Sequence, residues 1–183
     1  MGYRVSFARP LFWGGLALLV MVGQQTGLLS SKSSASVGVD VENNVVRVRS
    51  GDQTIEEAVR QARQSLPAFL ERAESAPSGW EMVSLKVALE GDTMVENIWV
   101  SDFQRPGFEI FTGRLANDPV DLPGLKAGDL VKFSYDQISD WAFVENGRGY
   151  GFYTTRVLTE GISEEELAMM NAFLSPDPVP TGW

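Results

Sequence analysis

The sequence predicts a single α+β domain in which an N-terminal amphipathic helix and a C-terminal helix pack on a twisted antiparallel sheet of about five to six strands. Three observations support this prediction. Apolar residues recur at helical spacing from residue 54, segments between residues 83 and 145 alternate apolar and polar residues, and a second helical pattern follows residue 163. We expect both helices to lie against one face of the sheet. The 183 residues suffice for one such domain.

The first helix is predicted between Thr54 and Ala73, where one apolar stripe runs at helical spacing. Thr54 and Glu57 have the spacing of a capping box, which would mark the start of this helix. Pro67 falls inside the stripe, and because proline has no N–H to donate, we expect a kink or a split there. Ser65 would then cap a second helical piece.

The strands are predicted from alternation with period two. The clearest pair covers residues 83–89 and 93–101, with Gly91-Asp92 as the turn between them. Residues 37–49 alternate in two short pieces, as a small hairpin or edge strand would. Turn-rich segments separate the remaining strand candidates, which are residues 109–115, 130–134 and 142–145.

The C-terminal helix is predicted from a capping box of Ser163 and Glu166, followed by an apolar side over residues 167–174. The Pro-rich residues 175–183 should form a flexible tail. The domain therefore covers residues 36–174, and residues 1–35 form a separate segment.

That first segment has the order of an export signal: Arg4 and Arg9 precede an apolar run over residues 11–23, and no acidic residue interrupts it. Two alternatives stay open. A cleavable signal peptide could end at Ala35 after a Ser-rich stretch, or residues 11–29 could remain as a membrane anchor. Both alternatives place the domain in the cell envelope, on the periplasmic or extracellular side.

Composition excludes several classes of chemistry. The chain has no Cys and no His, so disulfides, thiol nucleophiles, imidazole bases and the usual zinc sites are excluded. We expect no cofactor and no metal. Whether the protein is an enzyme stays open, with a non-catalytic role favoured. A net charge of −9 also makes nucleic acid a poor partner.

Two carboxylates are the candidate catalytic residues. With a two-residue turn at Gly91-Asp92, Glu96 would lie opposite Val87 and face the core. A buried carboxylate needs a basic partner such as Arg156 or Arg114, or its pKa rises, which is how a general acid is made. Asp140 is expected at a corner where a strand ends, next to Trp141, and would accept local backbone hydrogen bonds.

The candidate binding residues are aromatic or lie near one arginine: Trp99, Trp141, Tyr153, Thr155 and Arg156. Trp99 would be exposed on a binding face or covered by another element. Residues 153–156 place hydroxyls beside a guanidinium, a set that could hold a carboxylate or a phosphate. The glycine-rich residues 146–151 complete no phosphate-loop pattern, so we interpret them as a hairpin turn.

Four segments together resemble a known family. They are residues 96–100 (ENIWV), 113–119 (GRLANDP), 128–129 with 138–141 (GD and ISDW), and 151–158 (GFYTTRVL). In this order they are similar to the bacterial YegJ-like family, domain of unknown function 2314, over about residues 54–158. The family often has His where this chain has Asn97, so a His-dependent role would be absent. The resemblance implies one compact domain and does not point to a particular activity, substrate or cofactor.

Three functions therefore stand as hypotheses. The first is a non-catalytic binding module of the envelope, with an envelope protein or a small ligand as its partner. The second is a small immunity or inhibitor protein whose acidic surface neutralises a basic partner. The third is a hydrolase that uses Glu96 and Asp140 as acid and base. The membrane would be contacted only through an uncleaved N-terminal segment.

Overall fold

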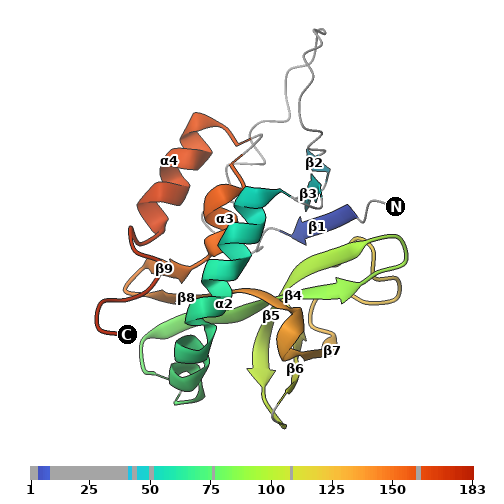
Figure 1. Cartoon of the computed structure of the whole chain (residues 1–183), viewed down its shortest axis with the longest axis horizontal. Coiled ribbons are helices and arrows are strands. Elements are labelled where there is room, and N and C mark those ends of the chain that lie inside the picture. Colours follow the sequence, from blue (N-terminus) through green and yellow to red (C-terminus); the bar gives the residue numbers. More distant parts are fainter. Residues whose placement is uncertain are drawn as a thin grey trace, which may run out of the picture.

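The structure, a computed structural model, describes residues 4–8, 41–42, 45–49, 52–75, 77–107, 109–159 and 162–183. The apolar run and the Ser-rich stretch predicted within residues 11–36 lie outside these ranges. Among the described residues, no helix is both long and apolar enough to cross a membrane. The described chain is an α+β fold, as predicted (Figure 1).

Helix α2 spans Gln53–Glu74 and turns a stripe of buried apolar residues toward the sheet. It is capped by Asp52, whose Oδ1 accepts hydrogen bonds from two N–H groups of the first turn at 2.9 and 3.4 Å. The predicted capping box of Thr54 and Glu57 was wrong. The carboxylate of Asp52 accepts hydrogen bonds from N–H groups that have no partner within the helix. Its negative charge is also favourable at the positive end of the helix dipole.

Pro67 lies inside α2 without dividing it. Of the two predicted outcomes, a kink or a split, the split was therefore wrong, and Ser65 is a mid-helix residue. Ser65 Oγ hydrogen-bonds to the carbonyls of Gln61 (3.2 Å) and Ala62 (3.1 Å) in the preceding turn. Buried apolar side chains on both sides of Pro67 hold the helix against the sheet, which offsets the missing N–H bond.

The described strands form one sheet in the order β2-β3-β1-β5-β4-β8-β9, while β6 pairs with β5 and carries β7. All pairs are antiparallel except β1 with β5. Strands β4 to β9 supply the predicted antiparallel part. The bounds are β1 Arg4–Ala8, β2 Val41–Glu42, β3 Val45–Arg49, β4 Trp80–Glu90, β5 Val95–Gln104, β6 Ile110–Leu115, β7 Leu130–Ser134, β8 Ile138–Glu145 and β9 Arg148–Gly151.

The β4–β5 connection is longer than predicted, and Glu96 lies opposite Leu89 instead of Val87. The register thus differs by two residues, so every side chain keeps its predicted face. A tight contact shapes this connection. A Cβ on Gly91 would lie 2.3 Å from Asp121 Oδ2, so only glycine fits there.

Strand β8 begins earlier than predicted, and Asp140 and Trp141 lie within it instead of at a corner. All of β8 except its last residue is buried, because the strand pairs with β4 and β9 and is covered on both faces. Its turn into β9 is Asn146-Gly147, as predicted. Both residues have positive φ, 50° and 73°, as a two-residue hairpin of type I′ requires.

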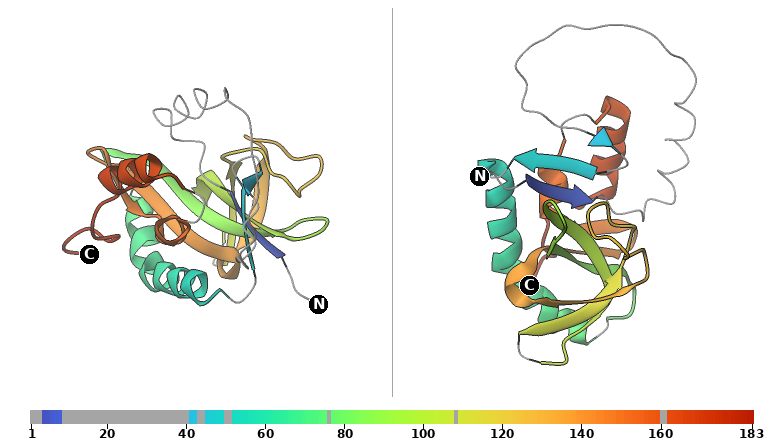
Figure 2. Two further views of the ribbon diagram at one scale, coloured as in Figure 1. Left: turned by 90° about the horizontal axis from the view of Figure 1, so that it is seen from above. Right: turned by 90° about the vertical axis from the view of Figure 1, so that its right-hand side faces the viewer.

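The helices cover opposite faces of the sheet. Helix α4 (Glu164–Phe173) starts at the predicted Ser163 capping box and packs through Met170 on Trp99. Helix α2 covers the other face, as the left view in Figure 2 shows. The expectation that both helices share one face was wrong, because the strands are apolar on both sides. The short helix α3 (Tyr153–Val157) contacts α2.

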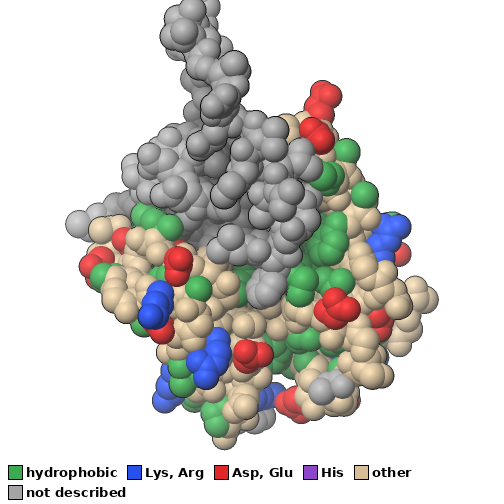
Figure 3. All heavy atoms as spheres, turned by 180° about the vertical axis from the view of Figure 1, so that it is seen from behind, with side chains coloured by type: hydrophobic (Ala, Val, Ile, Leu, Met, Phe, Trp, Pro, Cys, Tyr) green, Lys and Arg blue, Asp and Glu red, His purple; other side chains and the backbone are tan. Residues whose placement is uncertain are grey.

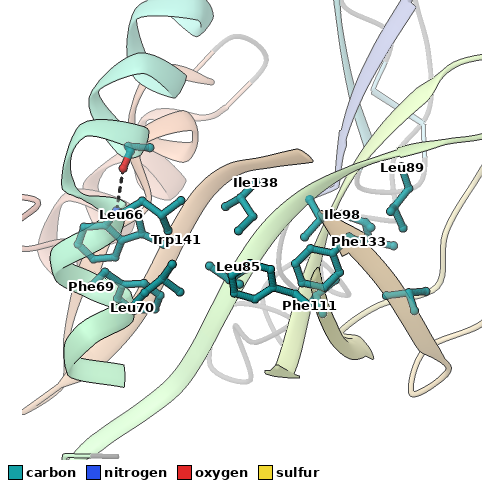
Figure 4. Packing of buried hydrophobic residues seen from close by; sticks show 14 of the residues in the cluster. Leu66, Phe69, Leu70, Leu85, Leu89, Ile98, Phe111, Phe133, Ile138 and Trp141 are labelled. Carbon is teal, nitrogen blue, oxygen red and sulfur yellow. Dashed lines mark hydrogen bonds between the residues drawn. The ribbon is translucent and has the colours of Figure 1, made fainter. Parts of the chain in front are cut away.

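The main core lies between α2 and the sheet (Figure 4). Trp141 of β8 is fully buried there and stacks on Phe69 with 4.7 Å between ring centroids. Its indole Nε1 donates to Ala62 O (3.1 Å), the dashed line in Figure 4, and also to Ser65 Oγ (3.1 Å). The aromatic core is thus joined to the α2 backbone by a hydrogen bond as well as by packing.

Residues 175–183 pack on the domain, which corrects the expectation of a flexible tail. The amide of Gly151 donates to Pro178 O (2.7 Å). Trp183 stacks on Trp80 (5.6 Å) and Phe143 (5.6 Å), and the guanidinium of Arg72 lies 4.6 Å from its ring centroid. The indole of Trp183 shields apolar surface of the domain from solvent. This burial holds residues 175–183 against the domain.

Candidate functional site

A buried polar cluster, here the Asp140 cluster, joins Lys86, Asp140, Thr154 and Trp99. Asp140 and Lys86 are cross-strand partners on β8 and β4. Thr154 Oγ1 bridges them, because it accepts from Lys86 Nζ (2.9 Å) and donates to Asp140 Oδ2 (2.7 Å). The Lys86 ammonium lies 5.0 Å from the Trp99 ring centroid, within reach of a cation–π interaction.

Asp140 also fixes the start of helix α3. Its carboxylate accepts from the backbone N of Tyr153 (3.2 Å), Thr154 (2.8 Å) and Trp141 (2.8 Å). The chain reaches this position through two left-handed residues, Gly151 (φ 74°) and Phe152 (φ 54°). A Cβ on Gly151 would lie 2.1 Å from the carbonyl oxygen of Trp141, so glycine is required there.

Burial governs ionisation in the Asp140 cluster. Loss of solvent lowers the pKa of Lys86 from 10.5 to about 8, although the charge of Asp140 opposes this shift. Burial likewise raises the pKa of Asp140, opposed by Lys86 and by the hydrogen bonds from Thr154. Lys86 and Asp140 are each 1% exposed and Thr154 is 0% exposed, so no substrate touches them in this structure. We interpret the cluster as structural.

Glu96 is fully buried, but neither predicted arginine meets it. Its carboxylate accepts hydrogen bonds from the backbone N of Val120 (3.0 Å) and Asp121 (2.9 Å). The predicted ion pair was wrong, because Arg114 and Arg156 donate to main-chain carbonyls instead. Glu96 therefore holds the loop that follows β6 against β5.

Glu96 and Asp140 lie on opposite faces of the sheet. Glu96 faces the side of Leu89, toward α2, while Asp140 faces the side of Lys86, toward α4. The two carboxylates cannot reach one substrate, so the acid–base pair of the hydrolase hypothesis does not form. No group of three or more acidic residues in the described ranges is placed to hold a metal ion.

Two of the candidate binding residues are part of the packed interior. Trp99 is 1% exposed beneath α4 and Trp141 is 0% exposed beneath α2. Trp99 was considered as either exposed or covered, and it is covered. Its Nε1 has no hydrogen-bond partner among the described residues.

Tyr153 and Arg156 line an open hollow of about 520 Å³. One wall is the first three turns of α2, the second is α3, and the third is the segment with Pro176 and Pro178. Thr155 is partly buried and is not among the lining residues. The structure thus brings two of the five predicted binding residues to one accessible place. Volumes of this size are usual for small-molecule sites.

The α2 wall carries groups that were not among the candidate site residues. Glu57 and Gln61 line the hollow one helical turn apart, with Ala58 between them. Glu57 accepts from both Arg60 and Gln61, and these hydrogen bonds lower its pKa. The sequence analysis missed Glu57 and Gln61 because it considered only the apolar stripe of this helix, and both residues lie on the solvent side.

Arg156 is held by the protein itself. Nε donates to Gly151 O (2.9 Å) and Nη1 to Ser175 O (2.8 Å), while Nη2 is buried without a partner in the described part of the chain. Burial lowers the pKa of Arg156. The guanidinium of Arg156 therefore holds the backbone at residues 151 and 175 next to α3.

The face opposite to that of Figure 1 mixes acidic and basic side chains over its described part and shows no continuous basic patch (Figure 3).

Comparison with family models matches residues 52–174 to the family described as "Uncharacterized protein conserved in bacteria (DUF2314)". The chain belongs to this family. The DUF2314 region runs from the cap of α2 to the end of α4 and contains Glu96 and the Asp140 cluster. It extends beyond the residues 54–158 that carry the resemblance in sequence.

Two named proteins are similar to this DUF2314 chain. Uncharacterized protein YegJ of Escherichia coli (strain K12) is 25% identical over 135 residues, which cover 74% of this chain and 86% of YegJ. A protein of Neisseria meningitidis serogroup B, named as an ankyrin repeat protein, is 36% identical over 77 residues, or 42% of this chain and 30% of that protein. The match thus spans less than a third of that longer relative. No solved structure matches the chain.

Proposed function

We propose that this DUF2314 protein is a non-catalytic binding module and that its ligand occupies the hollow between α2, α3 and the segment with Pro176 and Pro178. The observation that carries the proposal is the position of Tyr153 and Arg156 on the wall of that hollow. Its size suits a small molecule or the side chains of a partner. Three segments far apart in sequence form the walls, so the hollow exists only in the folded domain.

The absence of a catalytic arrangement supports binding over chemistry. Glu96 accepts from backbone amides, Asp140 caps α3, and both are buried. A general acid or base must reach the proton that it transfers. Among the described residues that line the hollow, Glu57 is the one carboxylate, so no pair of carboxylates faces a ligand there.

A fragment screen by NMR tests this proposal. Backbone amide shifts of the ¹⁵N-labelled full-length chain would be followed with a library of acids, amines and neutral compounds. Gln61→Trp should fill the hollow and abolish the shifts. Gln64→Trp is the matched control, because Gln64 is an exposed residue of α2 that does not line the hollow. Absence of any fragment that shifts hollow residues, or equal binding to Gln61→Trp, would disprove the proposal.

We also propose export to the cell envelope, supported by the basic flank and apolar run of residues 4–23. The pairing of Val5 with Val95 in β1 and β5 argues against it. A retained anchor would put these strands on opposite sides of the membrane, and cleavage after Ala35 would remove β1. Export therefore requires β1 to leave the sheet.

Intact mass and cell fractionation decide this question. Loss of residues 1–35 in a soluble envelope fraction supports the cleaved form, and the full mass in the membrane supports the anchor. Because the chain has no cysteine, Val5→Cys with Val95→Cys gives a clean second test. A disulfide formed by this pair when the purified full-length protein is oxidised, absent from both single variants, would show that β1 pairs with β5 and would count against export in either form.

A further inference from the structure

The charges on the hollow's walls indicate which ligands it takes. Taken alone, the hydroxyl of Tyr153 and the guanidinium of Arg156 would suggest that the ligand is an anion such as a carboxylate. The contacts of Arg156 argue against that choice. Two of its nitrogens donate to the carbonyls of Gly151 and Ser175, and the third is buried. The Tyr153 hydroxyl is likewise engaged, 2.9 Å from Ser65 Oγ.

Glu57 is the acidic side chain that lines the hollow. Its side chain is 46% exposed, and hydrogen bonds from its neighbours favour its ionised form. Its present partner, the guanidinium of Arg60, is 57% exposed and lies three residues along the same helix. Exposed pairs of this kind are weak, so a cation in the hollow can share or replace Arg60.

The rest of the lining combines apolar side chains with the neutral polar side chains of Gln53, Thr54 and Gln61. Ala58 faces the hollow from α2, Val157 from α3, and Pro176 and Pro178 from the third side. These groups would contact the body of a ligand, while Glu57 contacts its charged end. The net charge of −9 favours the approach of cations.

The geometry points to a small organic cation, an amine or guanidinium on an apolar body, as the ligand class of this hollow. The inference rests on the proposed binding function and adds the chemistry of the ligand. Glu57 holds the cation, and Arg60 is the internal competitor for the same carboxylate.

The test compares two probes with similar bodies and opposite charges, 2-phenylethylamine and 3-phenylpropionate, titrated by NMR into the full-length chain. The amine should bind and shift residues around the hollow. Glu57→Gln should weaken amine binding about tenfold, since a charge-assisted hydrogen bond is lost. Glu56→Gln, on the same turn but outside the lining, should change nothing. Arg60→Gln should strengthen amine binding by removing the competitor.

Tighter binding of 3-phenylpropionate, no binding of the amine, or no effect of Glu57→Gln would overturn the inference. These failures differ from failure of the proposed function. If the fragment screen finds acids or neutral compounds in the hollow, binding stands and the cation is wrong. If no fragment of any charge binds there, both proposals fail.

Discussion

Thr154 donates twice to one oxygen of Asp140: its backbone N lies 2.8 Å and its Oγ1 2.7 Å from Asp140 Oδ2. This pair joins the middle of β8 to the start of α3. Lys86 Nζ donates to the same hydroxyl, so the Thr154 side chain is hydrogen-bonded to two buried charged groups, the Lys86 ammonium and the Asp140 carboxylate. Much of the expected sensitivity of the domain to mutation follows from this relationship.

Asp140→Asn should destabilise the domain by about 3 kcal/mol, because it leaves Lys86 without its compensating charge and turns an amide NH₂ toward N–H donors. Chemical denaturation followed by circular dichroism measures the effect. Asp92→Asn, at an exposed position, is the control and should change stability by less than about 0.5 kcal/mol. Equal effects of the two variants would contradict the role assigned to Asp140.

Stability should rise between pH 8 and pH 10. Burial lowers the pKa of Lys86 from its ordinary value of 10.5 to about 8 in the folded state, so above pH 8 the unfolded chain binds more protons than the folded chain. Deprotonation removes the free-energy penalty of a charged buried lysine. The free energy of unfolding should therefore increase by on the order of 2 kcal/mol. Urea denaturation at pH 7.5 and pH 10 measures it.

Lys86→Met is the control for this pH effect. It has no amine to titrate, so its stability should show no rise between pH 7.5 and pH 10. A rise that persists in Lys86→Met would assign the effect to another group. Measurements should stop at pH 10, because burial raises the pKa of Tyr153 and its ionisation would then lower stability.

Gly151→Ala and Gly147→Ala form a matched pair. The two glycines have nearly equal φ, 74° and 73°, but an added Cβ meets Trp141 O at 2.1 Å in the first case and open space in the second. We expect about 1 kcal/mol of destabilisation at Gly147 from backbone strain alone. Gly151→Ala should cost at least about 3 kcal/mol or prevent folding. Similar melting temperatures for the two variants would contradict the close contact.

Glu96→Gln should destabilise the domain by about 1–3 kcal/mol, because it replaces one of the two accepting oxygens with an NH₂ donor and removes the charge that strengthens the bonds from Val120 and Asp121. Hydrogen exchange should show faster exchange at Val120 and Asp121 in particular. Glu109→Gln, an exposed change of the same type, should leave their exchange unchanged. If exchange at Val120 and Asp121 is unaffected by Glu96→Gln, this carboxylate does not hold the loop.

Local patterns predicted the elements that have local causes. The apolar stripe of α2, the alternation of β4 and β5, the Ser163 cap and the Asn146-Gly147 turn all depend on neighbours in sequence. The face of Glu96 was also predicted, because an error of two residues in register conserves faces. The turn itself was wrong because its shape depends on Asp121, which no local pattern connects to Gly91.

The Asp140 cluster could not be predicted for a related reason. Lys86 lies on the face of β4 opposite to that of Leu85 and Val87, and this face is covered by α4, which is far along the chain. One signal was present: Lys86 stands between buried apolar residues opposite Trp99, where a lysine is expensive unless it has partners. The hollow was invisible to sequence reasoning, since its three walls meet only after folding.

The two-residue turn at Asn146-Gly147 has a consequence for the order of folding. Strands β8 and β9 are joined by the shortest connection a hairpin allows, and hairpins of this kind form in about 1–10 μs. Pairing of β1 with β5 instead closes a loop of nearly half the chain, and such contacts form more slowly. We therefore expect the β8–β9 hairpin to belong to the folding nucleus and β1 to join last, when the rest of the sheet is already built.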